Sequence, residues 1–443
     1  MCTDRRDIIR TDILIVGSGC AGLYCAANLP QDKSVTIITK ADVKSSDSFL
    51  AQGGICVLKS EEDYNSFFQD TLKAGHFEND KRAVEIMIQS STEIMQDLLS
   101  YGVDFDRESD GALSYTREGA HSASRILYHQ DITGEEITKK LFSAASKLPN
   151  VKILEYTTMI DIVRQGNSCR GAIVKSKTGK PYMIRADITI LATGGIGGLY
   201  PRSTNFRHLT GDAIALALKH NIKLKDANYV QIHPTTLFSN KKEDRCFLIS
   251  ESVRGEGAKL YDKSGNRFVD ELLPRDLLTQ EILKQMEKDN TEFVWEDLRA
   301  IPKEELLRHF PNIVEHCKKA GYDVSKECIP VVPAQHYYMG GIAVTYNSKS
   351  SMDRLYAIGE TACTGVHGKN RLASNSLLES LVFAKRAAIE IGEQFSLTSL
   401  EESVYKEYDL SKYADSEKIE EEYHVLVLNE IARLDKEAKA KEL

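Results

Sequence analysis

The sequence predicts an α/β protein: a Rossmann-like domain that is interrupted by an inserted α+β capping domain and followed by a short C-terminal helical segment. Three apolar strand-like runs that end in glycine lie far apart in the chain, which indicates one sheet assembled from distant segments. A charge-rich stretch separates the second run from the third. We therefore place the first part of the Rossmann-like domain at 1–226, the cap at 227–337, the second part at 338–395 and the helical segment at 396–443.

The first glycine-ended run carries the most informative motif of the chain. The apolar residues 13–16 lead into Gly17-x-Gly19-x-x-Gly22 and then into a helix-like segment. Glycines at this spacing let the backbone approach a pyrophosphate at a helix N-terminus, so the motif predicts a nucleotide cofactor. The acidic residue that commonly binds a ribose hydroxyl is missing, because Lys40 follows the second strand. This motif alone leaves NADP and FAD both open.

Two further runs supply the rest of the predicted sheet. They are ADITILATGG at 186–195 and DRLYAIGE at 353–360, and a helical pattern follows the second of them. Between the fingerprint and these runs, residues 151–185 alternate polar and apolar side chains, with turn signals at Gly166 and Gly179. Such alternation is typical of antiparallel strands. We therefore expect an antiparallel accessory layer over 151–185.

The inserted segment and the chain end differ in composition from the strands. Residues 227–337 are rich in charge, contain the only tryptophan, Trp295, and are bounded by HPT and HYY. We expect them to form a lid or cap over the Rossmann-like domain. From residue 396 the sequence is polar and helical and ends in DKEAKAKEL, whose Lys and Glu residues are typical of a solvated helix face.

The composition limits the classes of function. The chain has 443 residues, 42% of them hydrophobic, and a net charge of -8, which disfavours binding to nucleic acid or to an anionic membrane. The nine cysteines are scattered without a Cys-x-x-Cys pair, so we predict neither a metal site nor disulfides. No apolar run approaches the roughly eighteen residues of a membrane span, and we expect a soluble, cytoplasmic protein. An anionic substrate therefore requires a local cluster of Arg and His.

Six polar segments combine Arg, His or Glu with small residues, which lets a polar side chain stand in a confined site. They are TREGAHSASR (116–125), YVQIHPTTLF (229–238), SESVRGEG (250–257), ELLPRDLL (271–278), PAQHYYMGG (333–341) and HGKNRLASNSLLES (367–380). With GSGCAG, FLAQGGI and YAIGE, they make the chain resemble the L-aspartate oxidase family of the fumarate reductase and succinate dehydrogenase flavoprotein superfamily. The motifs follow the family's order over most of the chain.

The resemblance implies FAD as the cofactor. The family also has a lysine at the position of Lys40, which accounts for the missing acid. Membrane-complex relatives carry the flavin covalently on a histidine where this chain has Asp47, which implies non-covalent FAD. The residues that would bind the cofactor are Gly17, Ser18, Gly19, Cys20, Ala21, Gly22, Lys40, Asp47, Ser48, Phe49, Leu50, Ala51, Gln52, Gly53, Gly54, Asp212, Glu360, Ser376 and Leu377.

For the substrate, the resemblance implies a clamp for a dicarboxylate, a task that suits the planar guanidinium of Arg. Arg275 matches the family's proton-transfer arginine. Because a guanidinium pKa lies above roughly 12, this role suits a proton donor better than a base. The residues that would hold the carboxylates are His233, His336 and Arg371, with Ser250 and Ser374 as hydroxyl donors. Ser250 stands where the family usually has threonine.

Glu118 distinguishes between two activities. By resemblance it faces the amino group of the substrate, which succinate and fumarate lack. We therefore predict oxidation of L-aspartate to iminoaspartate, with O2 (giving H2O2) or fumarate as acceptor, as the first step of NAD synthesis through quinolinate and beside quinolinate synthase. A soluble fumarate reductase or succinate dehydrogenase flavoprotein is the alternative. A non-catalytic flavoprotein module is a second alternative, which the presence of Arg275 and Arg371 disfavours.

Neighbours of the predicted site have competing interpretations. Arg254 and Glu256 either pair with each other inside the protein or contact the substrate. His121 and Arg125 are interpreted as a brace for the loop that carries Glu118. Longer family members have a sizeable C-terminal helical domain, of which 396–443 would be a shortened form.

Overall fold

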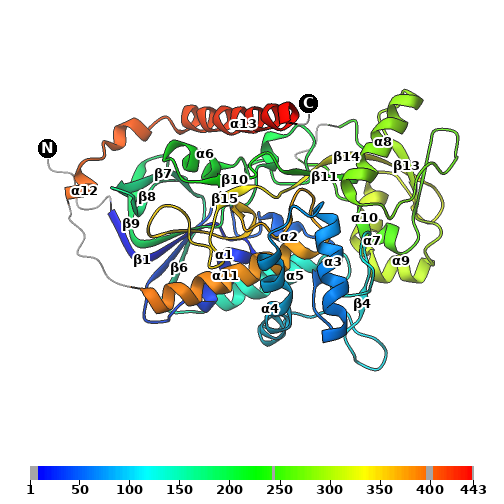
Figure 1. The fold of residues 1–443 in the computed structure, drawn as a ribbon, viewed down its shortest axis with the longest axis horizontal. Coiled ribbons are helices and arrows are strands. Elements are labelled where there is room, and N and C mark those ends of the chain that lie inside the picture. The colour runs from blue at the N-terminus through cyan, green and yellow to red at the C-terminus, as the bar shows by residue number, and fades with distance from the viewer. Residues whose placement is uncertain (1–7, 242–244, 396–402, 442–443) are drawn as a thin grey trace.

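A seven-stranded sheet forms the centre of the larger part of the computed structural model, which describes residues 8–241, 245–395 and 403–441 (Figure 1). Five strands are parallel, in the order β6-β2-β1-β9-β16, and β8 and β7 extend the sheet from β9 as an antiparallel hairpin. The strands are β1 (Ile8–Val16), β2 (Val35–Ile38), β6 (Val151–Leu154), β7 (Thr157–Gln165), β8 (Ser168–Ser176), β9 (Pro181–Leu191) and β16 (Leu355–Ala357).

The three glycine-ended strands are neighbours, which confirms that part of the prediction. Ile190 of β9 pairs with Ile15 of β1 on one side and with Tyr356 of β16 on the other. The antiparallel pairing predicted over 151–185 is confirmed for β7, β8 and the start of β9, but the prediction of an accessory layer is wrong. Strand β6 pairs in parallel with β2, and β7 and β8 continue the main sheet. The reason is that alternation reports which face of a strand is buried, not the direction of its partner.

Helices cover both faces of this sheet, because successive side chains of β1 point to opposite faces. Ile13 and Ile15 belong to an apolar cluster with α1, α4, α5 and α11, whereas Leu14 and Val16 belong to a second cluster with α6 and α13. Burial on both faces explains the nearly continuous apolar sequence of the central strands. The helices are α1 (Cys20–Asn28), α4 (Lys81–Ser100), α5 (Thr133–Ser146), α6 (Asp212–Lys219), α11 (Asn375–Gln394) and α13 (Ser416–Lys441).

The predicted helical end of the chain is anchored on the sheet. Helix α13 lies along α6 (Figure 1), and its Tyr423, Val427 and Ile431 are buried in the same apolar cluster as Leu14. Its last part, over 435–440, is exposed, as the Lys- and Glu-rich sequence predicts. Residues 396–402 of the predicted segment lie outside the described residues.

The residues of the predicted cap contain a second sheet with its own apolar core, at the right of Figure 1. This sheet is antiparallel and four-stranded, in the order β11-β14-β13-β12. Leu260, Ile282 and Val331 are among the fully buried residues of the core. The elements are β11 (Val230–Leu237), α7 (Glu251–Gly255), β12 (Lys259–Tyr261), α8 (Arg275–Asp289), β13 (Val294–Asp297), α9 (Lys303–His309), α10 (Pro311–Lys319) and β14 (Ile329–Tyr338).

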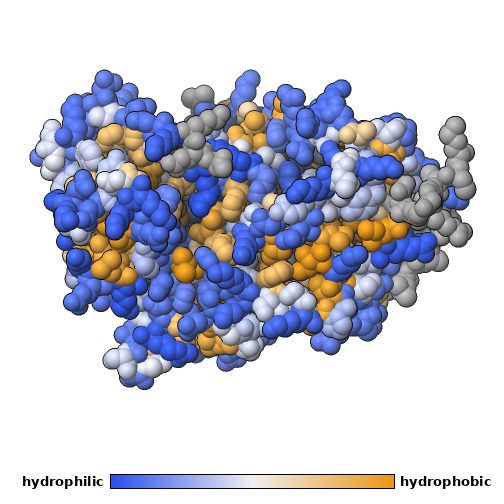
Figure 2. Space-filling model, turned by 180° about the vertical axis from the view of Figure 1, so that it is seen from behind, coloured by the Kyte–Doolittle hydropathy of each residue, from blue (hydrophilic) through white to orange (hydrophobic). Residues whose placement is uncertain are grey.

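Two further three-stranded sheets and three more α-helices complete the described fold. Figure 2 shows a surface that is mostly polar, with apolar residues gathered in separate patches. Within the described ranges, no helix has the length and apolar character needed to cross a membrane. One sheet has the order β3-β5-β4, with β3 (Ile55–Cys56), β4 (Tyr115–Thr116) and β5 (Ile126–Leu127), and the other has the order β10-β15-β17, with β10 (Leu224–Lys225), β15 (Gly341–Ala343) and β17 (Ala362–Cys363). The helices are α2 (Asp47–Leu50), α3 (Tyr64–Ala74) and α12 (Ser403–Lys406).

Candidate active site

One cavity of about 480 Å³ extends from the glycine turn after β1 to the residues of the predicted cap. The structure brings to its wall every residue predicted to touch cofactor or substrate except Gly22. The residues on the wall are Gly17, Ser18, Gly19, Cys20, Ala21, Lys40, Asp47, Ser48, Phe49, Leu50, Ala51, Gln52, Gly53, Gly54, Glu118, Asp212, His233, Ser250, Arg275, His336, Glu360, Arg371, Ser374, Ser376 and Leu377.

The turn after β1 explains the position of Gly22. Gly17 has a φ of +117°, and a Cβ there would lie 1.9 Å from the carbonyl oxygen of Ala192. A Cβ on Gly22 would lie 2.2 Å from the carbonyl oxygen of Gly17, so Gly22 lies beneath the turn and allows α1 to approach it. Neither position admits a side chain. The N-terminus of α1 consequently faces the cavity, where the positive end of the helix dipole favours a phosphate and the N–H of Cys20 donates to Ser48 Oγ at 3.1 Å.

Lys40 and Asp212, which are both predicted for the cofactor site, pair with each other. Lys40 Nζ lies 3.0 Å from Asp212 Oδ2 and 3.4 Å from Thr210 Oγ1. Asp212 is the first residue of α6, and Lys40 follows β2. The pair therefore ties the end of a central strand to the start of a helix at the cavity wall.

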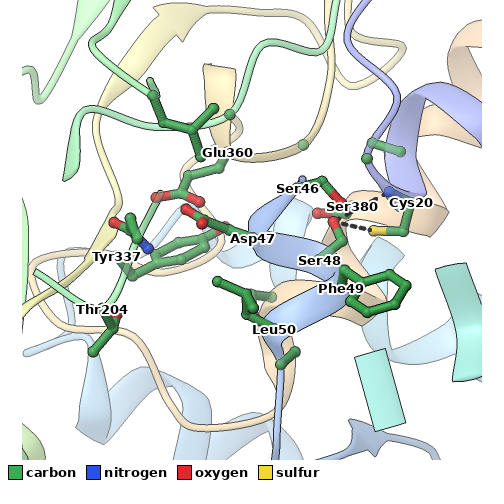
Figure 3. A pocket seen from close by; sticks show the side chains of 18 of the residues that line it. Cys20, Ser46, Asp47, Ser48, Phe49, Leu50, Thr204, Tyr337, Glu360 and Ser380 are labelled. Carbon is green, nitrogen blue, oxygen red and sulfur yellow. Dashed lines mark hydrogen bonds between the residues drawn. The ribbon is translucent and has the colours of Figure 1, made fainter. Parts of the chain in front are cut away.

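The carboxyl groups of Asp47 and Glu360 are directed toward each other at the cavity wall (Figure 3). Desolvation raises the pKa of Asp47, although its Oδ1 accepts the N–H of Phe206 at 3.0 Å. Desolvation, together with the neighbouring Asp47, raises the pKa of Glu360, whose Oε1 accepts the N–H of Tyr338 at 2.8 Å. Because two adjacent carboxyl groups disfavour double ionisation, the pair retains a proton near neutral pH.

A glutamine joins the two predicted substrate arginines. Arg275 Nη1 donates to Gln231 Oε1 at 3.0 Å, and Gln231 Nε2 donates to the carbonyl oxygen of Arg371 at 2.9 Å. Arg275 Nε also donates to Glu251 Oε2, and Arg371 Nη1 donates to Ser376 Oγ at 2.8 Å. Burial and the charge of Arg275 lower the pKa of Arg371 to about 10, which leaves this guanidinium protonated at neutral pH. Both guanidinium groups are thus fixed at the cavity wall with their charge retained.

The two predicted histidines lie beside each other on β11 and β14, with ring centroids 5.1 Å apart. Burial, followed by the charge of Arg275, lowers the pKa of His233 and of His336 well below the usual value, so both imidazoles are neutral near pH 7. His233 Nδ1 lies 3.0 Å from the carbonyl oxygen of Thr235 and 3.2 Å from its N atom, so it can donate to the first or accept from the second, while Nε2 finds no hydrogen-bond partner among the described residues. Since a carboxylate only accepts, it would select the tautomer with hydrogen on Nε2.

The Glu118 carboxylate is enclosed by serine hydroxyls. Ser252 Oγ donates to its Oε1 at 2.8 Å, and Ser374 Oγ donates to its Oε2 at 2.5 Å. Gly53 leaves the necessary space, because a Cβ there would lie 2.5 Å from Oε1. Ser250 Oγ in turn donates to Ser252 Oγ at 3.1 Å. Ser250 and Ser374 are therefore placed on the cavity wall as predicted, but their hydroxyl hydrogens are directed to protein groups.

Known proteins resemble the chain in sequence and in fold. Residues 12–377 match the family described as FAD binding domain. The chain is 50% identical over 402 residues to the L-aspartate oxidase of Clostridium perfringens, an alignment that covers 91% of each chain. The chain belongs to the L-aspartate oxidase family. A second member, from Clostridium acetobutylicum, is 47% identical over 388 residues, which covers 88% of this chain and 89% of that relative.

The fold extends beyond this family. The E. coli quinol fumarate reductase FrdA superposes with a TM-score of 0.84 at 29% identity, over 94% of this chain and 74% of that one. The predicted fold class and the predicted family are therefore confirmed. Membership of the L-aspartate oxidase family and of the FAD binding domain family identifies FAD as the cofactor.

The residues of the cavity fit FAD, as expected of an L-aspartate oxidase family member. The glycine turn leaves room for a pyrophosphate at the N-terminus of α1. At the next segment, Asp47 Oδ2 and Gln52 Oε1 are buried without a hydrogen-bond partner among the residues that the structure describes, so they can accept hydrogens from a bound group. In the same described ranges, no group of three or more His, Cys, Asp or Glu side chains could hold a metal ion.

Three residues that act within this L-aspartate oxidase site received no role from the sequence. Gln231 and Glu251 hold Arg275, and Ser252 holds Glu118. A signal existed for Gln231, because it is two residues before His233 and side chains alternate along a strand. Glu251 and Ser252 gave no comparable signal, since their partners lie in other elements of the fold.

The structure also resolves the competing interpretations near the site. Arg254 Nη1 lies 3.9 Å from Glu296 Oε1, whereas Glu256 pairs with His309. Neither Arg254 nor Glu256 lines the cavity, so both a mutual pair and a substrate contact are wrong. The two residues are close in sequence, but Arg254 lies within α7 and Glu256 follows its end, and each side chain meets a different partner.

The brace predicted for the Glu118 loop is present. Arg125 is fully buried and forms ion pairs with Asp63 and Asp70 at 2.9 and 2.8 Å. His121 Nε2 lies 3.0 Å from the carbonyl oxygen of Ala373, and its Nδ1 lies 3.0 Å from Arg125 Nη1. The loop that carries Glu118 is therefore fixed to α3 and to the segment before α11.

Proposed function

We propose that the chain oxidises L-aspartate to iminoaspartate with FAD, as the first step of NAD synthesis through quinolinate. The observation that carries the proposal is the position of Glu118 in the same cavity as Arg275 and Arg371. A carboxylate is a suitable partner for the ammonium of an amino acid, whereas succinate and fumarate offer no such group. The identity to relatives named L-aspartate oxidase supports the same assignment.

The proposed clamp matches the charges of the substrate. Arg275 and Arg371 supply two positive charges for the two carboxylates of L-aspartate. His233 and His336 donate hydrogen bonds without adding charge, because their lowered pKa values keep both imidazoles neutral. Glu118 then balances the substrate ammonium. Each charged group of the substrate thus meets a group of opposite charge, which favours transfer of a highly charged molecule into a confined site.

The chain contributes binding and orientation to the reaction. When bound, FAD would accept a hydride from Cα of the substrate and thereby supply the redox chemistry. The glycine turn at Gly17, the segment 47–54 and the side chains of Lys40, Asp212 and Glu360 would hold the cofactor. Contacts at both carboxylates and at the amino group fix the orientation of Cα. We propose residues 227–337 as a cap that excludes water from this site.

Anaerobic reduction of the holoenzyme tests the proposal. Purified protein is mixed with L-aspartate or with succinate in the absence of oxygen, and the flavin absorbance is followed. Bleaching by L-aspartate is expected. Bleaching by succinate alone would instead establish the alternative, a soluble fumarate reductase or succinate dehydrogenase flavoprotein. Admission of O2 or addition of fumarate to the bleached enzyme then identifies the acceptor, with H2O2 or succinate as the measured product.

We also propose that FAD is bound without a covalent link. The supporting observation is that Asp47, a carboxyl group held by the Phe206 N–H, occupies the place of the histidine in covalent relatives. Acid precipitation of the holoenzyme should release all the flavin into the supernatant. Flavin that stays in the pellet would contradict non-covalent binding.

The product suggests where the enzyme acts. An imine hydrolyses in water, so iminoaspartate must be used soon after it is formed. We propose that it passes to quinolinate synthase held near this enzyme, and that both proteins act in the cytoplasm. Co-purification of the two proteins, with and without L-aspartate, tests this contact. Failure of the two proteins to co-purify under either condition would oppose it.

A further inference from the structure

The support of Glu118 comes from both sides of its carboxylate, but the two supporting serines differ in their relation to the cavity. Ser374 donates to Oε2 and also lines the cavity. Ser252 donates to Oε1 at 2.8 Å, is only 2% exposed and is not on the cavity wall. Ser252 can therefore influence a substrate only through its hydrogen-bond partners Glu118 and Ser250, which line the cavity.

The hydroxyl of Ser252 is itself held in one direction. Ser250 Oγ donates to Ser252 Oγ at 3.1 Å, which leaves the Ser252 hydrogen to be donated to Glu118. The N–H of Ser252 donates to Ser250 Oγ at 3.2 Å, so both serines are fixed at the start of α7. The result is a directed chain of hydroxyl groups that runs from Ser250 through Ser252 and ends on the Glu118 carboxylate.

Glu118 Oε1 also faces Gly53. Gly53 presents no side chain there, although a Cβ would lie 2.5 Å from this oxygen. Without the Ser252 hydroxyl, Oε1 would lose the one side-chain donor that it has among the described residues. A carboxylate held by a single hydroxyl can rotate away from a substrate ammonium, which weakens a contact that depends on direction.

We propose that Ser252 is a positioning residue that sets the preference for a dicarboxylate carrying an α-amino group over one without it. The inference rests on the proposed function, because it assumes that Glu118 faces the amino group. The hydrogen bonds of the Ser252 hydroxyl go to Glu118 and Ser250. None of them involves the four side chains of the carboxylate clamp, which are Arg275, Arg371, His233 and His336. Loss of the Ser252 hydroxyl should therefore affect L-aspartate and leave fumarate largely unaffected.

The test compares two substrates in the FAD-loaded enzyme. Ser252→Ala and Ser252→Gly remove the hydroxyl without adding volume, and Ser252→Thr retains it. For each variant, kcat/KM is measured for L-aspartate oxidation and for fumarate reduction with a reduced dye. The control is Ser91→Ala, since Ser91 is 1% exposed and also makes two hydrogen bonds, to Ile88 and from Leu58, away from the cavity.

The expected result is a fall of about tenfold in the ratio of the two kcat/KM values for Ser252→Ala and Ser252→Gly, the size of one hydrogen bond to a charged group. Ser252→Thr should restore the ratio, and Ser91→Ala should keep it. A ratio within about twofold of wild type in both hydroxyl-free variants, or equal losses for both substrates, would overturn the proposal. If the proposed function itself is wrong, L-aspartate will not reduce the flavin of the wild-type enzyme. That result is distinguishable from a failure of the Ser252 proposal.

Discussion

Arg275 Nε donates to Glu251 Oε2 at 2.5 Å, and the two side chains enter the cavity from different helices, α8 and α7. Burial alone would raise the pKa of Glu251, but the charges of Arg275 and Arg254 outweigh it and lower this pKa. Glu251 is therefore ionised at neutral pH and fixes the orientation of the arginine. The pair is almost fully enclosed, with side chains 7% and 3% exposed, so solvent screens it little.

Replacement of Glu251 by glutamine should reduce turnover. The amide keeps the shape of the side chain but removes the negative charge, so Arg275 would shift toward other acceptors. We expect kcat for L-aspartate to fall about a hundredfold, a typical loss for a misplaced catalytic group. Glu271→Gln is the control, because Glu271 is also buried in the predicted cap and pairs with Arg267 at 2.6 Å. It should lower the melting temperature while kcat is retained; equal kcat losses in both variants would contradict the role of Glu251.

Glu118→Gln should separate the two activities of the superfamily. The neutral amide cannot balance the substrate ammonium, and its NH2 group cannot accept the hydroxyl that Ser252 or Ser374 donates. We expect kcat/KM for L-aspartate to fall on the order of a hundredfold, as for loss of a buried charge partner. Fumarate reduction by the same variant should stay near the wild-type rate. Similar losses in both assays would remove the amino-group role of Glu118.

Gly17→Ala should destabilise the protein even without cofactor. A Cβ at Gly17 would lie 1.9 Å from a backbone oxygen, and the φ of +117° disfavours any side chain. We expect the free energy of unfolding of the apo-protein to fall by more than about 3 kcal/mol, measured by urea titration. Gly19→Ala is the matched variant, because its Cβ would lie 3.1 Å from the Ser48 hydroxyl, which can move. Equal midpoints for the two variants would show that the turn tolerates a side chain.

Lys40→Met should weaken FAD binding more than it affects stability. The lysine is partly exposed, so its pair with Asp212 contributes little to folding, but its loss leaves an unbalanced carboxylate at the cofactor site. We expect the dissociation constant for FAD, measured by fluorescence quenching, to rise about tenfold. Lys33→Met, which removes the lysine of the surface pair with Asp32, should leave FAD binding unchanged. An unchanged dissociation constant for Lys40→Met would exclude Lys40 from the cofactor site.

The sequence allowed prediction of the parts of the fold that depend on local pattern. Glycine-ended apolar strands placed β1, β9 and β16 in one sheet, and the motif series placed distant residues on one cavity wall. The sequence did not reveal that β6 is parallel to its neighbour β2. Polar and apolar side chains alternate along an edge strand whether its partner is parallel or antiparallel. Gln231 and Ser252 were missed for a related reason. Gln231 bonds the backbone of Arg371 and Ser252 bonds the side chain of Glu118, both more than a hundred residues away. Alternation with His233 can place Gln231 on the face of the site, but no local spacing identifies these partners.

The Asp47 and Glu360 pair should make the apo-protein less stable as pH rises. The pKa of Asp47 is raised from 3.8 to about 7 and that of Glu360 from 4.5 to about 8, with desolvation as the largest cause. A raised pKa means that the folded protein binds protons more tightly than the unfolded chain. The stabilisation is therefore complete below about pH 4 and is lost as pH rises through about 7 to 8.

Melting temperatures of the apo-protein between pH 5 and 9 check this sign. We expect the melting temperature of the wild type to fall toward pH 9 relative to that of the variant Asp47→Asn/Glu360→Gln, whose amides do not titrate. Asp323→Asn is the control, because the pKa of Asp323 is lowered to about 2 and its titration ends below the tested range. It should follow the wild-type curve. Parallel curves for wild type and the double variant would show that neither carboxyl group retains its proton in the folded apo-protein.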